Sequence, residues 1–161
     1  MKKVIVIGCP GAGKSTFSRA LQQKTNLPLF YLDMLFWKVD KTTVSREEFD
    51  KRLLEVLLKD RWILDGNYGR TLELRLRECD TVFLFDLPVE ICLQGAKSRV
   101  GKKREDLPWV ESELDEEFRN WILEFPQKEL PHIYSLLEGY SNKHIVVFRS
   151  HNQVNDYLVN M

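Results

Sequence analysis

Cysteine is scarce in this sequence, with three residues at positions 9, 79 and 92. This odd and scattered set forms no CxxC or Cys/His spacing, which excludes a disulfide framework and a zinc site. Eight glycines and six prolines among 161 residues are too few for a fibrous or low-complexity chain. The composition is therefore that of an ordinary globular protein.

Long hydrophobic runs and an excess charge are also missing. No apolar run approaches the roughly 20 residues of a membrane-spanning helix, and the run at 4–7 is too short for a signal-peptide core. We therefore expect a cytoplasmic protein without a membrane partner. The 24 Lys and Arg residues balance 24 Asp and Glu residues, which argues against a general nucleic-acid binder. With 43% hydrophobic residues, the chain can build the core of one domain over residues 1–161.

Short apolar runs alternate with segments of helical periodicity. We predict strands at 4–7, 27–32, 61–64, 81–85 and 145–148. The predicted helices are 15–25, one that begins after the capping box of Ser45 and Glu48, 71–79, 89–100, one capped by Ser112, 126–140 with a break near Pro131, and 152–159. This alternation predicts parallel βαβ units in a three-layer α/β domain.

Ligands in such domains bind at the carboxyl ends of the strands. The residues at those ends are Gly8, Asp33, Asp65, Asp86 and Arg149. We therefore expect ligand-binding and catalytic residues among these five.

Residues 8–15 match the phosphate-binding motif G-x-x-x-x-G-K-[ST] in full, between a predicted strand and a predicted helix. Glycines let successive amides turn inward around an anion, and the following helix adds the positive end of its dipole. Lys14 is expected on the β- and γ-phosphates of a nucleotide, and the Ser15 hydroxyl on Mg²⁺. The residues expected to bind ATP here are Gly8, Pro10, Gly11, Ala12, Gly13, Lys14, Ser15 and Thr16.

A phosphate-loop enzyme needs a carboxylate on a neighbouring strand to hold Mg²⁺, directly or through water. Asp65 is the better of two candidates because Gly66 follows it and allows a ligand close to the backbone. The other, Asp86, precedes a predicted helix and is equally well explained as a helix cap. Ser15 and Asp65 are thus the predicted metal ligands.

A polar, Gly101-containing stretch interrupts the pattern and predicts a lid at about residues 100–112. Arginines that arrive with a lid neutralise charge on a transferred phosphoryl group. Arg99 and Arg119 flank this stretch, Arg104 lies within it, and all three are candidates for that contact. The alternative for each is a solvated surface side chain.

Asp33 follows the second predicted strand, across from the phosphate loop. A carboxylate there suits binding and deprotonation of an acceptor hydroxyl, although a capping or solvated loop Asp is an equal alternative. Phe36 and Trp37 either wall an acceptor pocket or cover the core.

Four segments are similar to sequence motifs of known protein families. They are residues 7–16, the run Leu32–Trp37, residues 62–68 and the Trp- and Phe-rich residues 118–126. With Asp65-Gly66 ahead of Arg70 and residues 85–88 ahead of Arg99, the chain resembles adenylate-kinase-like P-loop kinases. It resembles more closely the small bacterial family of DNA topology modulation proteins.

The resemblance implies a P-loop NTPase fold with a five-stranded parallel sheet in the order 2-3-1-4-5 and a short lid. It implies a phosphate contact for Arg99, a place near the adenine for Arg149 and an acceptor clamp in Arg70. Adenylate kinases carry Phe-Pro-Arg after the Asp-Gly, whereas Asn67, Tyr68 and Gly69 stand before Arg70 here. This departure counts against a standard nucleoside monophosphate acceptor.

The sequence therefore predicts a Mg²⁺- and ATP-dependent kinase, monomeric or weakly dimeric, acting on a small-molecule phosphate acceptor. Its predicted catalytic residues are Lys14, Asp33, Asp65, Arg70, Arg99 and Arg104. Two alternatives stay open: a nucleotide-binding regulator linked to DNA topology, and a slow ATPase without an acceptor.

Overall fold

The structure is a computed structural model that describes all residues 1–161. Five strands alternate with eight helices. In chain order the elements are β1 (Lys3–Gly8), α1 (Lys14–Thr25), β2 (Leu29–Tyr31), α2 (Leu32–Phe36), α3 (Arg46–Leu57), β3 (Trp62–Asp65), α4 (Gly69–Glu78), β4 (Thr81–Phe85), α5 (Val89–Arg99), α6 (Glu116–Lys128), α7 (Leu130–Glu138), β5 (His144–Phe148) and α8 (His151–Val159).

All strands are parallel, and their order is β2-β3-β1-β4-β5. This confirms the predicted α/β fold and the strand order. The central strand β1 pairs with β3 on one side and with β4 on the other. Because helices cover both faces of the sheet, Val4 to Ile7 of β1 are completely buried.

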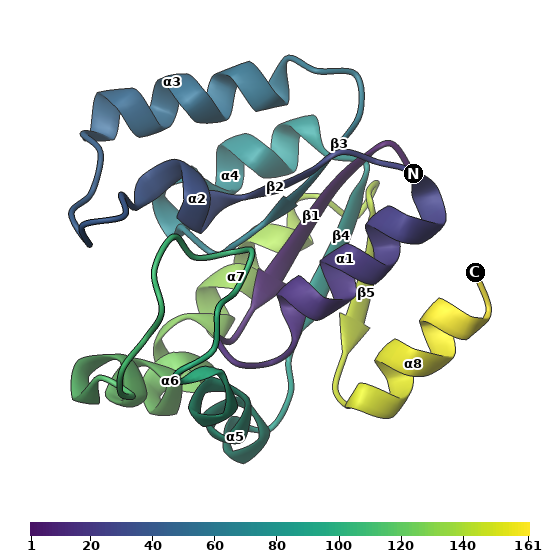
Figure 1. Ribbon diagram of the computed structural model, residues 1–161. Coiled ribbons are helices and arrows are strands. Elements are labelled where there is room, and N and C mark those ends of the chain that lie inside the picture. The colour runs from purple at the N-terminus through teal and green to yellow at the C-terminus, as the bar shows by residue number, and fades with distance from the viewer.

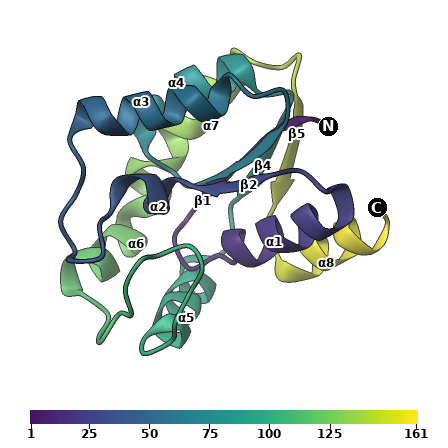
Figure 2. The same ribbon diagram turned by 45° about the horizontal axis from the view of Figure 1, so that its top comes forward.

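The helices form a layer on each face of the sheet (Figures 1 and 2). Helices α1 and α8 cover one face, and α3, α4 and α7 cover the other. Aromatic side chains attach the first layer: the Phe17 ring of α1 meets Phe83 and Phe148 edge-on, with centroids 4.8 and 5.4 Å apart. Such contacts place the start of α1 firmly at the end of β1.

Helices α5 and α6 and the connection between them, residues 100–115, lie at the carboxyl ends of the strands near α2 (Figure 2). This end holds every residue predicted to act chemically at a strand terminus. The connection contains the stretch predicted to be a lid, residues 100–112, and is three residues longer; we refer to it as the lid.

Several boundaries differ from prediction. Helix α6 is capped by Asp115 rather than Ser112, because the residues before Asp115 belong to the lid. It continues through Pro126, and the break comes at Glu129. Pro131 instead occupies the first turn of α7, where its missing N–H is not needed. Strand β2 ends at Tyr31, so Asp33 lies in the short helix α2 rather than at a strand end.

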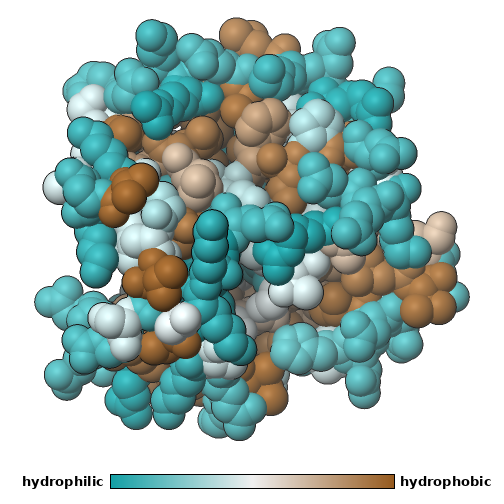
Figure 3. All heavy atoms as spheres, viewed as in Figure 1, coloured by the Kyte–Doolittle hydropathy of each residue, from teal (hydrophilic) through white to brown (hydrophobic).

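No helix combines the length and the apolarity needed to cross a membrane. On the face shown in Figure 3, hydrophobic side chains form several separate groups with hydrophilic side chains between them.

Candidate functional site

The phosphate loop between β1 and α1 has the conformation that its glycines predict. Gly8, Gly11 and Gly13 have φ values of 134°, 80° and 97°, which favour glycine. The amides of Gly11 and Gly13 have no hydrogen-bond acceptor within the protein. The loop therefore offers free N–H groups at the N-terminus of α1, where an anion is favoured.

Two side chains from other elements hold this loop in place. The Asn67 side chain accepts from the Gly8 amide at 2.9 Å and donates to the Gly8 carbonyl at 2.7 Å. His151, at the start of α8, donates through Nε2 to the Ala12 carbonyl at 3.1 Å, because a carbonyl oxygen can only accept. The loop is thereby fixed from the β3 side and from the β5 side.

Helix α5 packs directly on the loop backbone. A Cβ atom on Gly95 would collide with the Gly11 carbonyl, and a Cβ atom on Gly11 would collide with the Cys92 carbonyl. This pair of glycines lets α5 approach closely enough to bring Arg99 beside the loop. Gly95 could not be predicted as a site residue, because a single glycine in a helix carries no signal of its own.

Lys14 and Asp65 form the charged centre of the site. Lys14 Nζ donates to the Cys9 carbonyl at 2.9 Å, and burial lowers its pKa. Burial raises the pKa of Asp65 to about 6, although the positive charge of Lys14 opposes this shift. Asp65 Oδ2 is buried and has no hydrogen-bond partner. An unpaired buried carboxylate oxygen at this place fits a cation as its missing partner.

The residues present fit Mg²⁺ held in part by a nucleotide. No group of three or more His, Cys, Asp or Glu side chains is arranged to hold a metal ion. Mg²⁺ in phosphate-transfer sites is bound by one or two protein oxygens, with water and phosphate completing its coordination. The Ser15 hydroxyl and the unpaired Asp65 oxygen meet that requirement.

The lid closes over Ser15 through a small ionic network. Arg104 pairs with Asp106 at 3.2 Å and with Glu111 at 2.7 Å, and these side chains are largely buried. Ser15 Oγ donates to Asp106 Oδ2 at 3.3 Å. At the far side of the lid, the Trp109 ring meets Trp37 edge-on with centroids 5.1 Å apart. Asp106 and Trp109 are site residues that sequence reasoning missed.

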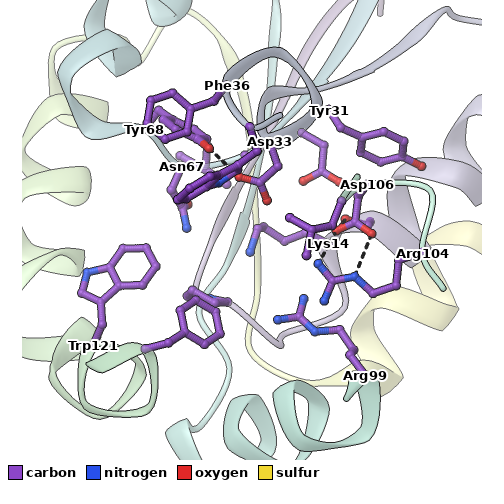
Figure 4. A pocket seen from close by; sticks show the side chains of 18 of the residues that line it. Lys14, Tyr31, Asp33, Phe36, Asn67, Tyr68, Arg99, Arg104, Asp106 and Trp121 are labelled. Carbon is purple, nitrogen blue, oxygen red and sulfur yellow. Dashed lines mark hydrogen bonds and ion pairs between the residues drawn. The ribbon is translucent and has the colours of Figure 1, made fainter. Parts of the chain in front are cut away.

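Two cavities meet at this centre. The P-loop cavity, about 730 Å³, lies between the loop, α1, the lid and α8, and the aromatic cavity, about 750 Å³, extends toward α2, α6 and α7. Both are lined by Lys14, Ser15, Arg99, Arg104 and Asp106. In Figure 4, Lys14 lies between Asp33 above and Arg99 below, with Trp121 on the opposite wall.

Asp33 projects into the aromatic cavity from α2, as Figure 4 shows. Its Oδ1 accepts a hydrogen bond from the Tyr68 hydroxyl at 2.5 Å. Burial raises the pKa of Asp33, and the Tyr68 hydrogen bond opposes part of that rise. Asp33 is therefore a more basic carboxylate than one in water, placed where it faces Lys14. Phe36 and Trp37 line the same cavity.

Arg99 lies where the two cavities join. Its Nε is buried without a hydrogen-bond partner, and burial followed by repulsion from Arg104 lowers its pKa. An unpaired guanidinium at this position can accept an anion without giving up an internal contact. Arg119, by contrast, is exposed and lines neither cavity.

The structure does not bring Arg70 or Arg149 into the site. Arg70 pairs with Asp50 of α3 at 2.6 Å and lines neither cavity, because the start of α4 turns its side chain toward α3. Arg149 is exposed and donates to the Tyr134 hydroxyl at 3.3 Å, outside both cavities. The acceptor clamp and the adenine contact predicted for them are absent from this arrangement.

Arg75 of α4 was missed entirely. It is completely buried and donates to the carbonyls of Gly66, Asn67 and Tyr68. It thereby fixes the turn after β3 that presents Asn67 and Tyr68. Its signal was its position in the apolar stripe of α4, three residues after Leu72 and one before Leu76.

No family model matches the chain. Two adenylate kinase sequences from Thermotoga neapolitana are 28% identical to it over 88 residues, which are 53% of this chain. The chain spans only 39% of the length of these kinases. A crystal structure of shikimate kinase from Bacteroides thetaiotaomicron superimposes with a TM-score of 0.61 at 16% identity, covering 98% of this chain and 94% of that one. These similarities support an adenylate-kinase-like P-loop kinase fold. They give no support to the DNA topology modulation family or to the regulator alternative.

Proposed function

We propose that this protein is an ATP-dependent kinase that transfers the γ-phosphate of ATP to a small acceptor. The observation that carries the proposal is the meeting of two cavities at Lys14, Ser15 and Arg99. A phosphoryl donor in one cavity and an acceptor in the other would share this junction. A protein that only binds or hydrolyses a nucleotide needs no second cavity of this size.

The donor belongs in the P-loop cavity. The free amides of Gly11 and Gly13 and the ammonium of Lys14 suit the phosphates. Ser15, together with Asp65 on the adjoining wall of the aromatic cavity, suits Mg²⁺. When bound, Mg²⁺ would neutralise charge on the phosphate oxygens. The similarity to adenylate kinases and the fold shared with shikimate kinase agree with ATP as the donor.

The acceptor belongs in the aromatic cavity, with its reactive oxygen near Asp33. In the proposed step, this oxygen forms a bond to the γ-phosphorus while the bond from that phosphorus to the β,γ-bridging oxygen breaks. ADP leaves with the electron pair, and Asp33 takes the proton of the acceptor. Burial raises the pKa of Asp33, which makes it a stronger base for this role.

The arginines act on the transferred group. Arg99 has an unpaired buried Nε at the junction, so we assign it the contact to the phosphoryl group during transfer. Arg104 forms ion pairs with Asp106 and Glu111, so we assign it the role of holding the lid closed.

The test measures ADP release from Mg·ATP against a panel of nucleosides, nucleoside monophosphates and small hydroxylated metabolites. The blank is Lys14→Ala, and the control is Lys24→Ala, which removes the same charge from an exposed position of the same helix. An acceptor that raises turnover about a hundredfold over the basal rate, equivalent to about 3 kcal/mol of barrier, would support the proposal. Intact ATP binding with no response to any acceptor would contradict it and favour a slow ATPase.

A further inference from the structure

One side of the aromatic cavity carries a carboxylate and no guanidinium. This side is built by α2, the segment after it and the turn after β3, and it presents Asp33, Phe36, Trp37, Asn67 and Tyr68. The only positive side chain there is Lys41, which is exposed. The two arginines nearest in sequence are engaged elsewhere, as the pairing of Arg70 with Asp50 and the burial of Arg75 show.

An anionic acceptor would therefore lack a partner on this side. A phosphate or carboxylate near Asp33 would place two negative charges together in a poorly solvated cavity, which is costly without a cation between them. A hydroxyl at the same place would donate a hydrogen bond to Asp33. Apart from the exposed Lys41, the lysine and arginine side chains of the cavity, Lys14, Arg99 and Arg104, lie at the junction where the transferred phosphoryl group belongs.

The remaining walls offer aromatic rings. Three indoles from separate segments line the cavity: Trp37 after α2, Trp109 in the lid and Trp121 in α6. Trp121 also meets Phe125 edge-on with centroids 5.8 Å apart, which holds the indole in place. Indole faces bind planar apolar groups and organic cations.

Three acidic side chains strengthen the preference against anions. Glu113, Asp115 and Glu129 line the cavity and form no ion pair. Glu113 and Asp115 are exposed and screened by water, as Lys41 is, so the half-buried Glu129 is the acid that most opposes an acceptor carrying phosphate or carboxylate.

We propose that the acceptor is a small alcohol without a negative charge, whose planar or cationic body lies against the indoles of Trp37, Trp109 and Trp121 while its hydroxyl donates to Asp33. This inference rests on the proposed kinase activity and narrows its substrate class. A preference for acceptors without a negative charge excludes nucleoside monophosphates as substrates. The chemistry is shared by nucleosides and aromatic alcohols, which are neutral, and by amino alcohols, which are cationic.

The experiment compares matched pairs of acceptors that differ by one anionic group. Each nucleoside is paired with its 5′-monophosphate, each aromatic alcohol with a carboxylated analogue and each amino alcohol with the corresponding hydroxy amino acid. We expect ADP release to show at least a tenfold higher kcat/KM for the non-anionic member of the productive pair. A monophosphate or carboxylate that works equally well or better would overturn the inference while leaving the kinase activity intact.

Binding without turnover is measured separately by quenching of tryptophan fluorescence in Lys14→Ala, because three of the four tryptophans line the cavity. Quenching by a neutral or cationic alcohol, but not by its anionic partner, supports the inference even if the wild type releases no ADP. In that case only the proposed kinase activity fails. Stronger quenching by the anionic members, or none by any alcohol, overturns the inference. Comparison of the neutral alcohols with the cationic amino alcohols shows which of the two kinds of acceptor the cavity binds.

A pair of variants on α6 tests the role of the indoles. Trp121→Ala should raise the KM for the acceptor at least tenfold with little change in the KM for ATP. Leu123→Ala, on the exposed side of the same helix, should leave both values unchanged. Thermal unfolding of both variants controls for loss of the fold. An unchanged acceptor KM in a folded Trp121→Ala protein would overturn the assignment of the indole wall.

Discussion

The two cavities that meet at Lys14 are built in different ways. The P-loop cavity relies on backbone amides of one short segment, whose direction is set by glycines with positive φ. The aromatic cavity is assembled from side chains of α2, the turn after β3, the lid, α6 and α7. A backbone site recognises phosphate in any sequence that preserves the loop, whereas a side-chain site can change its ligand with single substitutions. Under the proposed function, the donor would therefore be recognised by the fold itself and the acceptor by scattered side chains.

The largest effect is expected at Asp33, on the acceptor side alone. Asp33→Asn keeps the shape and removes the base, so kcat with the identified acceptor should fall about 10³-fold, within the range of general-base catalysis. ATP affinity, measured by calorimetry, should stay within twofold. Asp40→Asn, exposed in the following segment, is the control. A loss of ATP binding in Asp33→Asn would break the separation of the two cavities.

Arg99 tests the junction between the cavities. Arg99→Ala should lower kcat about 10²-fold, because a positive charge aimed at the transferred group acts mainly in the transition state. The dissociation constant of ATP should change much less. Arg119→Ala removes the same charge from an exposed position on α6 and should have no effect. If Arg99→Ala weakened ATP binding and left kcat intact, Arg99 would belong to the donor side only.

The pH dependence of folding stability that arises from Asp65 tests the proposed Mg²⁺ site. Burial raises the pKa of Asp65 to about 6, above its ordinary value of 3.8. The folded protein therefore binds this proton more tightly than the unfolded chain, and stability is lost as pH rises from about 4 through 6. Two pKa units correspond to about 3 kcal/mol, of which about 1–2 kcal/mol should remain after water enters the cavity.

In Asp65→Asn this loss should disappear, so the ligand-free variant should be more stable than the wild type at pH 8 and equal to it near pH 4. Thermal unfolding in metal-free buffer across this range measures the difference. Asp60→Asn, exposed just before β3, should follow the wild-type profile. A variant less stable than the wild type at pH 8 would show that the Asp65 charge stabilises the fold and would remove the argument for a missing cation.

The smallest effect is expected at Arg70, which lies outside both cavities. Its pair with Asp50 is about half exposed, and such pairs contribute at most about 1 kcal/mol. Arg70→Ala should therefore change acceptor KM and kcat by less than twofold. A tenfold rise in acceptor KM would show that Arg70 turns into the aromatic cavity during turnover and would restore its predicted role as an acceptor clamp.

Much of the fold and the donor side could be read from local sequence. The apolar strands, the strand order implied by the resemblance and the loop from Gly8 to Ser15 all appear in the structure. The polar stretch predicted to be a lid forms the connection between α5 and α6, and the resemblance to adenylate-kinase-like kinases pointed to Arg99. Asp33 was expected at a strand end and lies instead in α2, although it reaches the cavity all the same.

The residues of the aromatic cavity could not be predicted in the same way, because they come from distant segments that are brought together only by folding. Arg70 was expected in the site, but the start of α4 turns it toward Asp50. Arg75, five residues later, is buried in the turn that presents Tyr68. Their positions in the sequence do not show which of these two arginines would line a pocket and which would support the fold.

Local sequence is enough to place a phosphate loop between a buried strand and a helix, because glycine spacing and β-branched runs act over a few residues. The side chains that surround the loop are set by the packing of distant segments. The Asn67 contact to Gly8, the approach of Gly95 to Gly11 and the contact of Trp109 with Trp37 join segments far apart in the chain. Such contacts depend on how the strands order and how the helices pack, and no local pattern records them.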